Sequence, residues 1–207
     1  MTGAGPPRAA VGGAVIVGWR GLVGTVTGVV LITVALLPIT AAMVWVLARR
    51  RRAAGASAAT AWLQSTAEVG IAYGTLPWVW MILLPLRPVA GARGRVHLVP
   101  LMDLVAVIGQ GPTTAIVQVV GNLLVFAALG FFAPIRFSAL ASIARILALG
   151  AGCSVVVEVA QYVLRLDRVT SVDDVLLNAT GAVLAALASR RWWRSSAVGR
   201  GSATPVG

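Results

Sequence analysis

The chain has 207 residues, of which 58% are hydrophobic and 11% are charged, and its mean hydropathy is +0.91. A soluble domain carries roughly 25% charged residues, so this composition excludes a soluble globular protein and predicts one small helical membrane domain. The net charge of +11 comes from seventeen arginines and no lysine. These arginines flank apolar runs and form no groove interleaved with aromatic residues. We therefore expect them to set the topology near anionic lipid head groups, and we expect no nucleic-acid partner.

The apolar runs predict about five transmembrane helices, since a hydrocarbon core ~30 Å thick needs ~20 helical residues. The first predicted span covers residues 21–47, with a kink at Pro38. The four arginines of residues 49–52 follow it, and a linker of small residues runs to about Thr60. The second predicted span covers residues 62–86.

Three further spans are predicted over residues 113–133, 137–164 and 173–189. A loop over residues 87–112 precedes them, and a tight polar loop over residues 165–172 separates the last two. The sequence thus predicts an all-α fold, a polytopic helical membrane bundle of about five transmembrane helices.

The arginines also predict the orientation of the chain. With five spans, nine arginines fall on one side of the membrane and seven on the other. The tightest clusters, residues 49–52 and the R-R-W-W-R of residues 190–194, lie at helix ends on the same side, where the positive-inside rule acts most strongly. We expect a multi-pass protein of the cell membrane with its N-terminus outside, its C-terminus in the cytoplasm and the 165–173 loop outside.

Few residues of this chain suit metal or redox chemistry. Cys153 is the single cysteine and His97 is the single histidine. No disulfide framework, C-x-x-C motif or zinc site can be assembled from them. We therefore expect no metal and no cofactor.

Four of the six acidic residues fall within seventeen positions, at Glu158, Asp167, Asp173 and Asp174. Ionisable groups inside or against a hydrocarbon layer are energetically costly, so they mark a functional site by default. This stretch is the strongest functional signal in the chain.

Polar side chains on three predicted helices reach a similar depth. At ~1.5 Å per residue, Asn122 lies ~13 Å below the start of its span, Glu158 ~9 Å from the outer end of its span, and Asn178 ~8 Å below the start of its span. Gln118 and Asp174 stand four positions before the two asparagines and share their helix faces. We expect these helices to form one polar pocket that opens to the outer leaflet.

Several motifs resemble the VanZ family of bacterial membrane proteins. They are N-L-L-V-F-A-A-L-G-F at 122–131, E-V-A-Q at 158–161, R-V-T-S-V-D-D-V-L-L-N-A-T-G-A at 168–182, and H-L-V-P-L at 97–101, which is similar to the family's N-L-I-P-F. The resemblance covers about residues 62–190. It implies a VanZ-like four-helix membrane domain over residues 61–190. An N-terminal tail, an extra transmembrane helix and an Arg-rich linker occupy residues 1–60, and a basic, disordered cytoplasmic tail occupies residues 191–207.

The resemblance also implies a set of binding residues and a context. Carried over by motif position, the binding residues are Asn122, Glu158, Gln161, Arg168, Asp174 and Asn178. The family's founding member is associated with low-level resistance to teicoplanin, a glycopeptide antibiotic with a fatty-acyl tail.

Structural roles compete with functional ones at these positions. Asn122 and Asn178 can serve as hydrogen-bonded contacts between helices. Asp173 or its neighbour can cap the N-terminus of the last span, where the helix dipole favours a carboxylate, and Arg168 can simply pair with these aspartates. Glu158 is the strongest functional candidate, because a carboxylate in a low-dielectric site needs a proton, a cation or an arginine partner.

Three functions remain open. We favour a site that binds an amphiphile from the outer leaflet, such as a membrane lipid, an acylated antibiotic or a lipid-linked cell-wall precursor. An intramembrane enzyme acting on a lipid-linked envelope substrate would use Glu158 as a catalytic acid or base and Arg168 to hold a phosphate, but no Ser/His or Cys/His pair supports it. A small proton-linked transporter would use Glu158 as a relay, although five spans without a repeated half argue against it.

Overall fold

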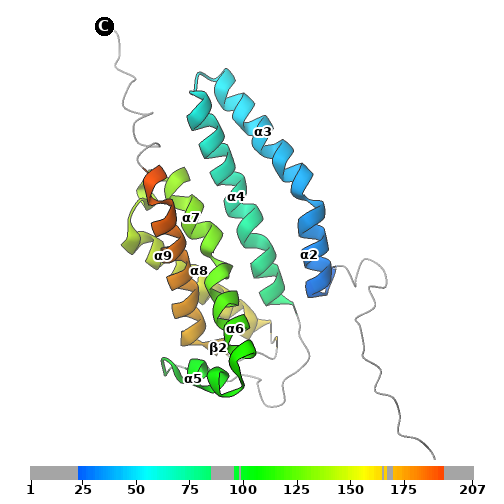
Figure 1. Ribbon diagram of the computed structural model, residues 1–207, viewed down its shortest axis with the longest axis vertical. Coiled ribbons are helices and arrows are strands. Elements are labelled where there is room, and N and C mark those ends of the chain that lie inside the picture. The colour runs from blue at the N-terminus through cyan, green and yellow to red at the C-terminus, as the bar shows by residue number, and fades with distance from the viewer. Residues whose placement is uncertain (1–22, 85–95, 98, 165, 167–169, 194–207) are drawn as a thin grey trace, which may run out of the picture.

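The protein is helical through nearly all of the residues that the computed structural model describes, which are 23–84, 96–97, 99–164, 166 and 170–193 (Figure 1). The α-helices are α2 (Val26–Ala35), α3 (Leu37–Ala53), α4 (Ala58–Leu83), α5 (Met102–Gly109), α6 (Pro112–Val125), α7 (Ala127–Arg136), α8 (Ile143–Val163) and α9 (Val172–Ser189). Two 3-10 turns, η1 (Ser138–Leu140) and η2 (Arg190–Trp192), complete them. The predicted all-α bundle is confirmed, with one small addition: the two-residue strands β1 (Val96–His97) and β2 (Thr170–Ser171) pair in parallel.

Three helical segments are long and apolar enough to cross a membrane: Pro112–Arg136, which joins α6 and α7, Ile143–Val163, and Val172–Trp192. The pair α2 and α3, bent by 42°, makes a fourth span if it is taken as one. By length and composition the described residues therefore provide three or four spans, fewer than the five predicted. The difference is α4, which is 26 residues long but less apolar than the other segments.

The bend between α2 and α3 lies where the sequence predicted a kink. Leu36 separates the two helices, and Pro38 occupies the first turn of α3. Proline has no backbone N–H and clashes with the preceding turn, so it fits the start of a new helix better than the interior of a long one. The predicted end of this span was too early, because α3 continues through the arginines of residues 49–52 to Ala53.

The helix α9 lies at the centre of the bundle, where it contacts α6, α7 and α8 (Figure 1). Two glycines let the backbones approach closely. A Cβ atom added to Gly181 would lie 1.9 Å from the carbonyl oxygen of Leu123, and one added to Gly130 would lie 2.0 Å from that of Ala182. Small residues at such crossings are how membrane helices gain dispersion contacts, since lipid offers no hydrophobic driving force between them.

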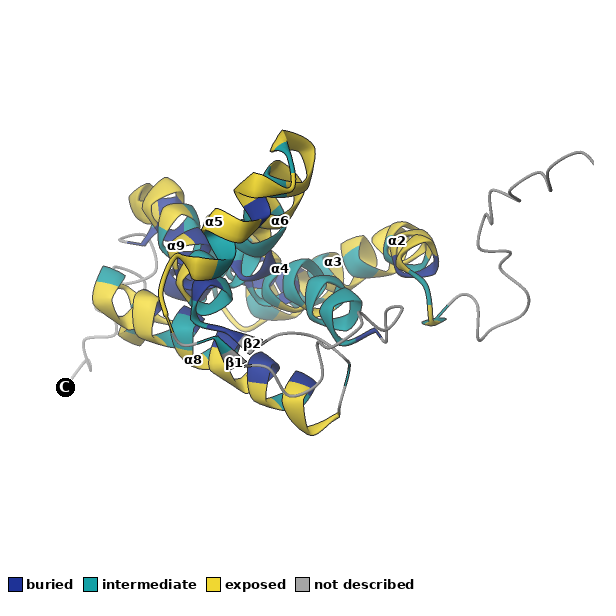
Figure 2. Cartoon of the chain, turned by 90° about the horizontal axis from the view of Figure 1, so that it is seen from below, coloured by how far each residue is buried: buried dark blue, intermediate teal, exposed yellow. Residues whose placement is uncertain are grey.

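Burial follows this arrangement. Figure 2 shows buried residues concentrated among α4, α8 and α9, while α2 is largely exposed. The buried core consists mainly of small and aliphatic residues, including Val125, Ala133, Ile135, Ile146, Ala182 and Ala186. The helix α4 joins this core along α7, and on another side it contacts α2 and α3.

Candidate functional site

The polar residues gather at the end of the bundle where α9 begins. The N-cap of α9 is Ser171, whose hydroxyl accepts a hydrogen bond from the backbone N–H of Asp173 at 3.1 Å. Asp173 and Asp174 occupy the first helical turn, where the helix dipole favours negative charge. The expectation that one of these aspartates caps α9 was therefore wrong, because Ser171 already holds that position.

Asp173 instead binds the start of a different helix, α5. Its carboxylate accepts hydrogen bonds from the backbone N–H groups of Leu101, Asp103 and Leu104, the last two at 3.0 Å. Asp173 is only 4% exposed. The first amides of a helix have no partner inside the helix, and α5 has no cap from its own N-cap side chain. Asp173 supplies that cap from α9.

The backbone at Leu101 turns the chain so that these amides face one point. Its φ of 68° lies in the left-handed region, which a residue with a side chain rarely adopts. The hydrogen bonds to Asp173 hold that conformation. Next to it, His97 Nδ1 lies 2.6 Å from Asp103 Oδ1, and the β1–β2 pairing places His97 opposite Ser171. The segment before α5 is thus fastened to the start of α9.

Five of the six candidate residues lie at this end of the bundle and can be described. The amide of Asn122 on α6 donates to Asp174 Oδ1 on α9. One turn further along α9, Asn178 Nδ2 donates to Ser154 Oγ on α8 at 2.8 Å. Polar side chains on one face of α9 therefore make hydrogen bonds to α6 and to α8.

Glu158 and Gln161 stand further along the same face of α8 and are each 6% exposed. Gln161 Nε2 donates to the carbonyl oxygen of Ile82 at 3.2 Å, which ties α8 to the end of α4. Arg168, the sixth candidate, and Asp167 lie outside the described residues.

Among the described residues, one small cavity adjoins part of this polar set. A cavity of about 10 Å³ lies beneath α5, lined by Asp103, Leu104, Val107, Gln118, Val119, Asp173, Asp174 and Leu177. That is about the space that one water molecule occupies. The site thus has hydrogen-bond donors and acceptors in place, with α5 closed over them.

The opposite side of α5 is apolar and exposed. The large hydrophobic residues exposed in and beside this helix are Val99, Leu101, Met102, Val105 and Ile108, at 43–67% exposure. The side of α5 toward α9 carries Asp103 beside the apolar Leu104 and Val107, so the helix is apolar nearly all round and suited to contact with lipid. Figure 1 places α5 at the tip of the bundle, beside the start of α6 and α9.

A second polar cluster joins three helices. Glu68 Oε2 on α4 accepts hydrogen bonds from Arg51 of α3 and from Arg136 Nε of α7, the latter at 3.0 Å. Arg51 also donates to Ser65 Oγ. Arg51 is seventeen positions from Glu68 in the sequence and Arg136 is sixty-eight, so no local sequence pattern predicts these contacts.

The sequence model of the VanZ/LLP1 family matches residues 71–193. The chain belongs to the VanZ/LLP1 family. This confirms the resemblance drawn from the motifs, although the matched region starts nine residues later than the 62–190 expected. The family region runs from within α4 through η2 and contains every candidate binding residue, whereas α2 and α3 precede it. Neither a curated protein nor a solved structure matches the chain at a significant level.

The chemistry available at this VanZ/LLP1 site is hydrogen bonding and charge pairing. The set consists of the carboxylates of Glu158 and Asp174 and the amides of Asn122, Asn178 and Gln161. They come from α6, α8 and α9, and α9 packs against both of the other helices. Among the described residues, no group of three His, Cys, Asp or Glu side chains is placed to hold a metal ion. The side-chain set suits recognition of a polar head group.

Proposed function

We propose that this VanZ/LLP1 protein binds an amphiphile from the membrane through the polar end of α6, α8 and α9. The observation that carries the proposal is the set of buried and half-buried polar side chains on three apolar helices. One pair joins α6 to α9 and another joins α8 to α9, and α5 lies over the first turn of α9. Polar groups at membrane depth are energetically costly, and a protein that keeps several of them in one place has a use for them.

Each candidate residue has a task in this proposal. Asn122 and Asp174 lie nearest to α5 and meet the head group first. Asn178, Glu158 and Gln161 supply further donors and acceptors at greater depth. Arg168, from the loop that precedes α9, contributes a positive charge for a phosphate or carboxylate, which a guanidinium binds through two parallel hydrogen bonds.

Entry to the site requires α5 to move. The cavity of about 10 Å³ beneath it is too small for a head group, so a ligand that enters there must displace α5 from the carboxylate of Asp173. The exposed apolar face of α5 lets the helix slide within the interface without exposing hydrocarbon to water. Hydrocarbon tails of the ligand stay in the bilayer beside α5 and α6.

Orientation decides which leaflet supplies the ligand. The C-terminal ends of α3, α7 and α9 lie far from α5, at the top of Figure 1. Arg50, Arg51 and Arg136 belong to the last turns of α3 and α7, and Arg190 follows α9. The positive-inside rule assigns that end to the cytoplasm. The polar end then faces the outer leaflet, where lipid-linked cell-wall precursors and acylated glycopeptides of the teicoplanin type are found, and capture of such a molecule would alter its access to the cell wall.

Binding of chemically matched probes to the purified protein in nanodiscs tests this function. The probes are an acylated glycopeptide, the same glycopeptide core without its acyl chain, and a lipid-linked cell-wall precursor. We expect saturable binding of at least one amphiphilic probe and no binding of the bare core. Absence of binding by both amphiphiles, or binding of the bare core as tight as that of the acylated glycopeptide, would rule the proposal out.

A further inference from the structure

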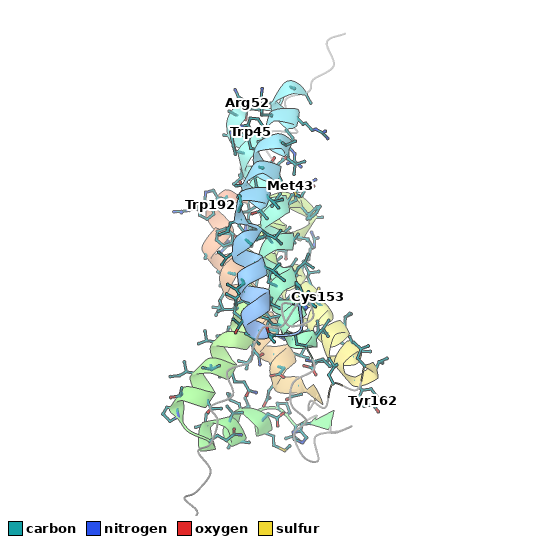
Figure 3. All side chains as sticks on the ribbon, turned by 90° about the vertical axis from the view of Figure 1, so that its right-hand side faces the viewer. Met43, Trp45, Arg52, Cys153, Tyr162 and Trp192 are labelled. Carbon is teal, nitrogen blue, oxygen red and sulfur yellow. The ribbon has the colours of Figure 1, made fainter. Side chains whose placement is uncertain are left out.

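An apolar groove of about 510 Å³ separates α2 and α3 from α4. It is lined by Ile32, Thr33, Leu36, Thr40, Met43 and Leu47 on one side, and by Glu68, Val69, Ala72, Tyr73, Leu76, Pro77 and Trp80 on the other. Its size is within the range of about 300–1,000 Å³ seen for ligand pockets. Figure 3 shows Met43 midway along this helical pair, with Trp45 and Arg52 above it toward the turn into α4.

The bend at Leu36 gives the groove its shape. Near the turn at residues 54–57, α3 packs closely on α4, whereas α2 has fewer contacts with it. The hydroxyl of Tyr73 crosses the gap and donates to the carbonyl oxygen of Thr33 at 2.7 Å. From Ile32 to Leu47 the groove runs ~22 Å at the helical rise, more than the ~15 Å that one leaflet contributes to the hydrocarbon core. One acyl chain fits along it.

Positive charge collects at the end of the groove nearest this turn. Glu68 lines the groove and is shared by Arg51 and Arg136, so two guanidinium groups meet one carboxylate and leave one positive charge in excess. Arg50 and Arg52, next to Arg51 on α3, are exposed. The guanidinium of Arg49 lies 4.7 Å from the centre of the Trp45 ring. A phosphate at this position would meet several cationic groups.

We propose that the groove between α2, α3 and α4 binds an anionic phospholipid, with one acyl chain in the groove and its phosphate at the arginines of residues 50–52. The site is separate from the amphiphile site, since its arginine end lies at the other end of the bundle and it uses none of the same residues. The apolar lining of the groove binds the acyl chain of the lipid, and the excess positive charge favours an anionic head group over a zwitterionic one. The bound lipid joins α2 and α3 to the helices of the family region.

Head-group selectivity is tested by native mass spectrometry of the full chain, titrated with phosphatidylglycerol and with phosphatidylcholine of the same acyl chains. We expect tighter binding of phosphatidylglycerol. The substitutions Arg50→Gln and Arg52→Gln leave the Arg51–Glu68 pair intact. Each should weaken the binding of phosphatidylglycerol about fivefold and leave the binding of phosphatidylcholine unchanged. Equal affinity of the wild type for the two lipids would overturn the proposal.

Occupancy of the groove is tested by filling it. Ala72 lines the groove and is exposed to the bilayer, so Ala72→Phe adds volume there without disturbing the core. The control is Ala148→Phe, at an exposed alanine on α8 outside the groove. We expect only Ala72→Phe to lose the tightly bound phosphatidylglycerol.

Retention of that lipid by Ala72→Phe would show that the arginines act as an unspecific surface charge. A lipid-free dimer would mean that a second copy covers the groove. Either result would contradict the proposal.

Discussion

The carboxylate oxygen Oδ2 of Asp173 lies 3.0 Å from the backbone nitrogen of Asp103, seventy positions earlier in the chain. This contact fixes α5 over the polar residues of α9, because the same carboxylate also binds the amides of Leu101 and Leu104. The position and the mobility of α5 therefore depend on the Asp173 side chain of α9. That dependence gives the proposed site its means of opening.

Removing the charge of Asp173 should release α5 without unfolding the bundle. Asp173→Asn keeps one acceptor oxygen but loses the charge-assisted bonds, each worth about 1.5–3 kcal/mol when intact. We expect faster hydrogen exchange at the amides of Leu101, Asp103 and Leu104, with little change in α8. Asp174→Asn is the control, since the neighbouring carboxylate contacts Asn122 instead. Unchanged exchange in Asp173→Asn would contradict this role.

The close packing of α9 predicts that Gly→Ala substitutions will differ in how much they destabilise the bundle. Gly181→Ala and Gly130→Ala place a Cβ atom within 2.0 Å of a backbone oxygen, so the helices must separate. We expect a destabilisation of about 1–3 kcal/mol or more from such overpacking. Gly152→Ala, where a Cβ meets nothing within 4 Å, should not be destabilised. Thermal unfolding in detergent compares the three variants, and equal midpoints would refute the helix crossing described.

The Glu68 cluster should contribute modestly to stability. Its carboxylate is 42% exposed, so water screens the attraction to the two arginines. A double-mutant cycle of Glu68→Gln with Arg136→Gln should give a coupling free energy of about 0.2–1 kcal/mol. The measurement is denaturant or thermal unfolding of the four proteins. A coupling near zero would show that this ion pair does not hold α4 to α7.

The orientation predicts opposite accessibility for two turns. In a chain whose Cys153 has been replaced by serine, Ala54→Cys lies in the turn after α3 and Gln110→Cys lies in the turn after α5, and both positions are exposed. A membrane-impermeant maleimide applied to intact cells should label position 110 and spare position 54. Labelling of position 54 alone would invert the topology and move the polar site to the cytoplasmic leaflet.

Local signals in the sequence predicted the helices well but predicted tertiary contacts poorly. The last span, expected over 173–189, is Val172–Ser189, because a polar N-cap and a continuous apolar run define it. The span expected over 137–164 begins only at Ile143, since η1 turns the chain first. The span expected over 113–133 is divided between α6 and α7 at Phe126.

In the candidate site, too, the positions of residues along the helices were predicted better than their tertiary contacts. Helical depth and spacing put Asn122 near the level of Asn178 and Glu158, whereas its amide donates to Asp174, one turn before Asn178. The bonds from Asp173 to α5 were missed, because they join positions about seventy residues apart and depend on the left-handed turn at Leu101. A hydrophobic residue in that conformation carries no sequence signal. Whether the polar residues hold a ligand stays a prediction.

The central claim is that the buried carboxylate of Glu158 helps to hold an amphiphile. Glu158→Gln keeps the shape of the side chain and removes its charge, so the bundle should fold and reach wild-type abundance in the membrane. Asp167→Asn, outside the motif residues, is the matched control.

Mass spectrometry of the lipids that co-purify with wild type, Glu158→Gln and Asp167→Asn measures this claim most directly. We expect an amphiphile enriched equally on wild type and Asp167→Asn and lost from Glu158→Gln at equal protein amount. An identical lipid profile for all three proteins would contradict it.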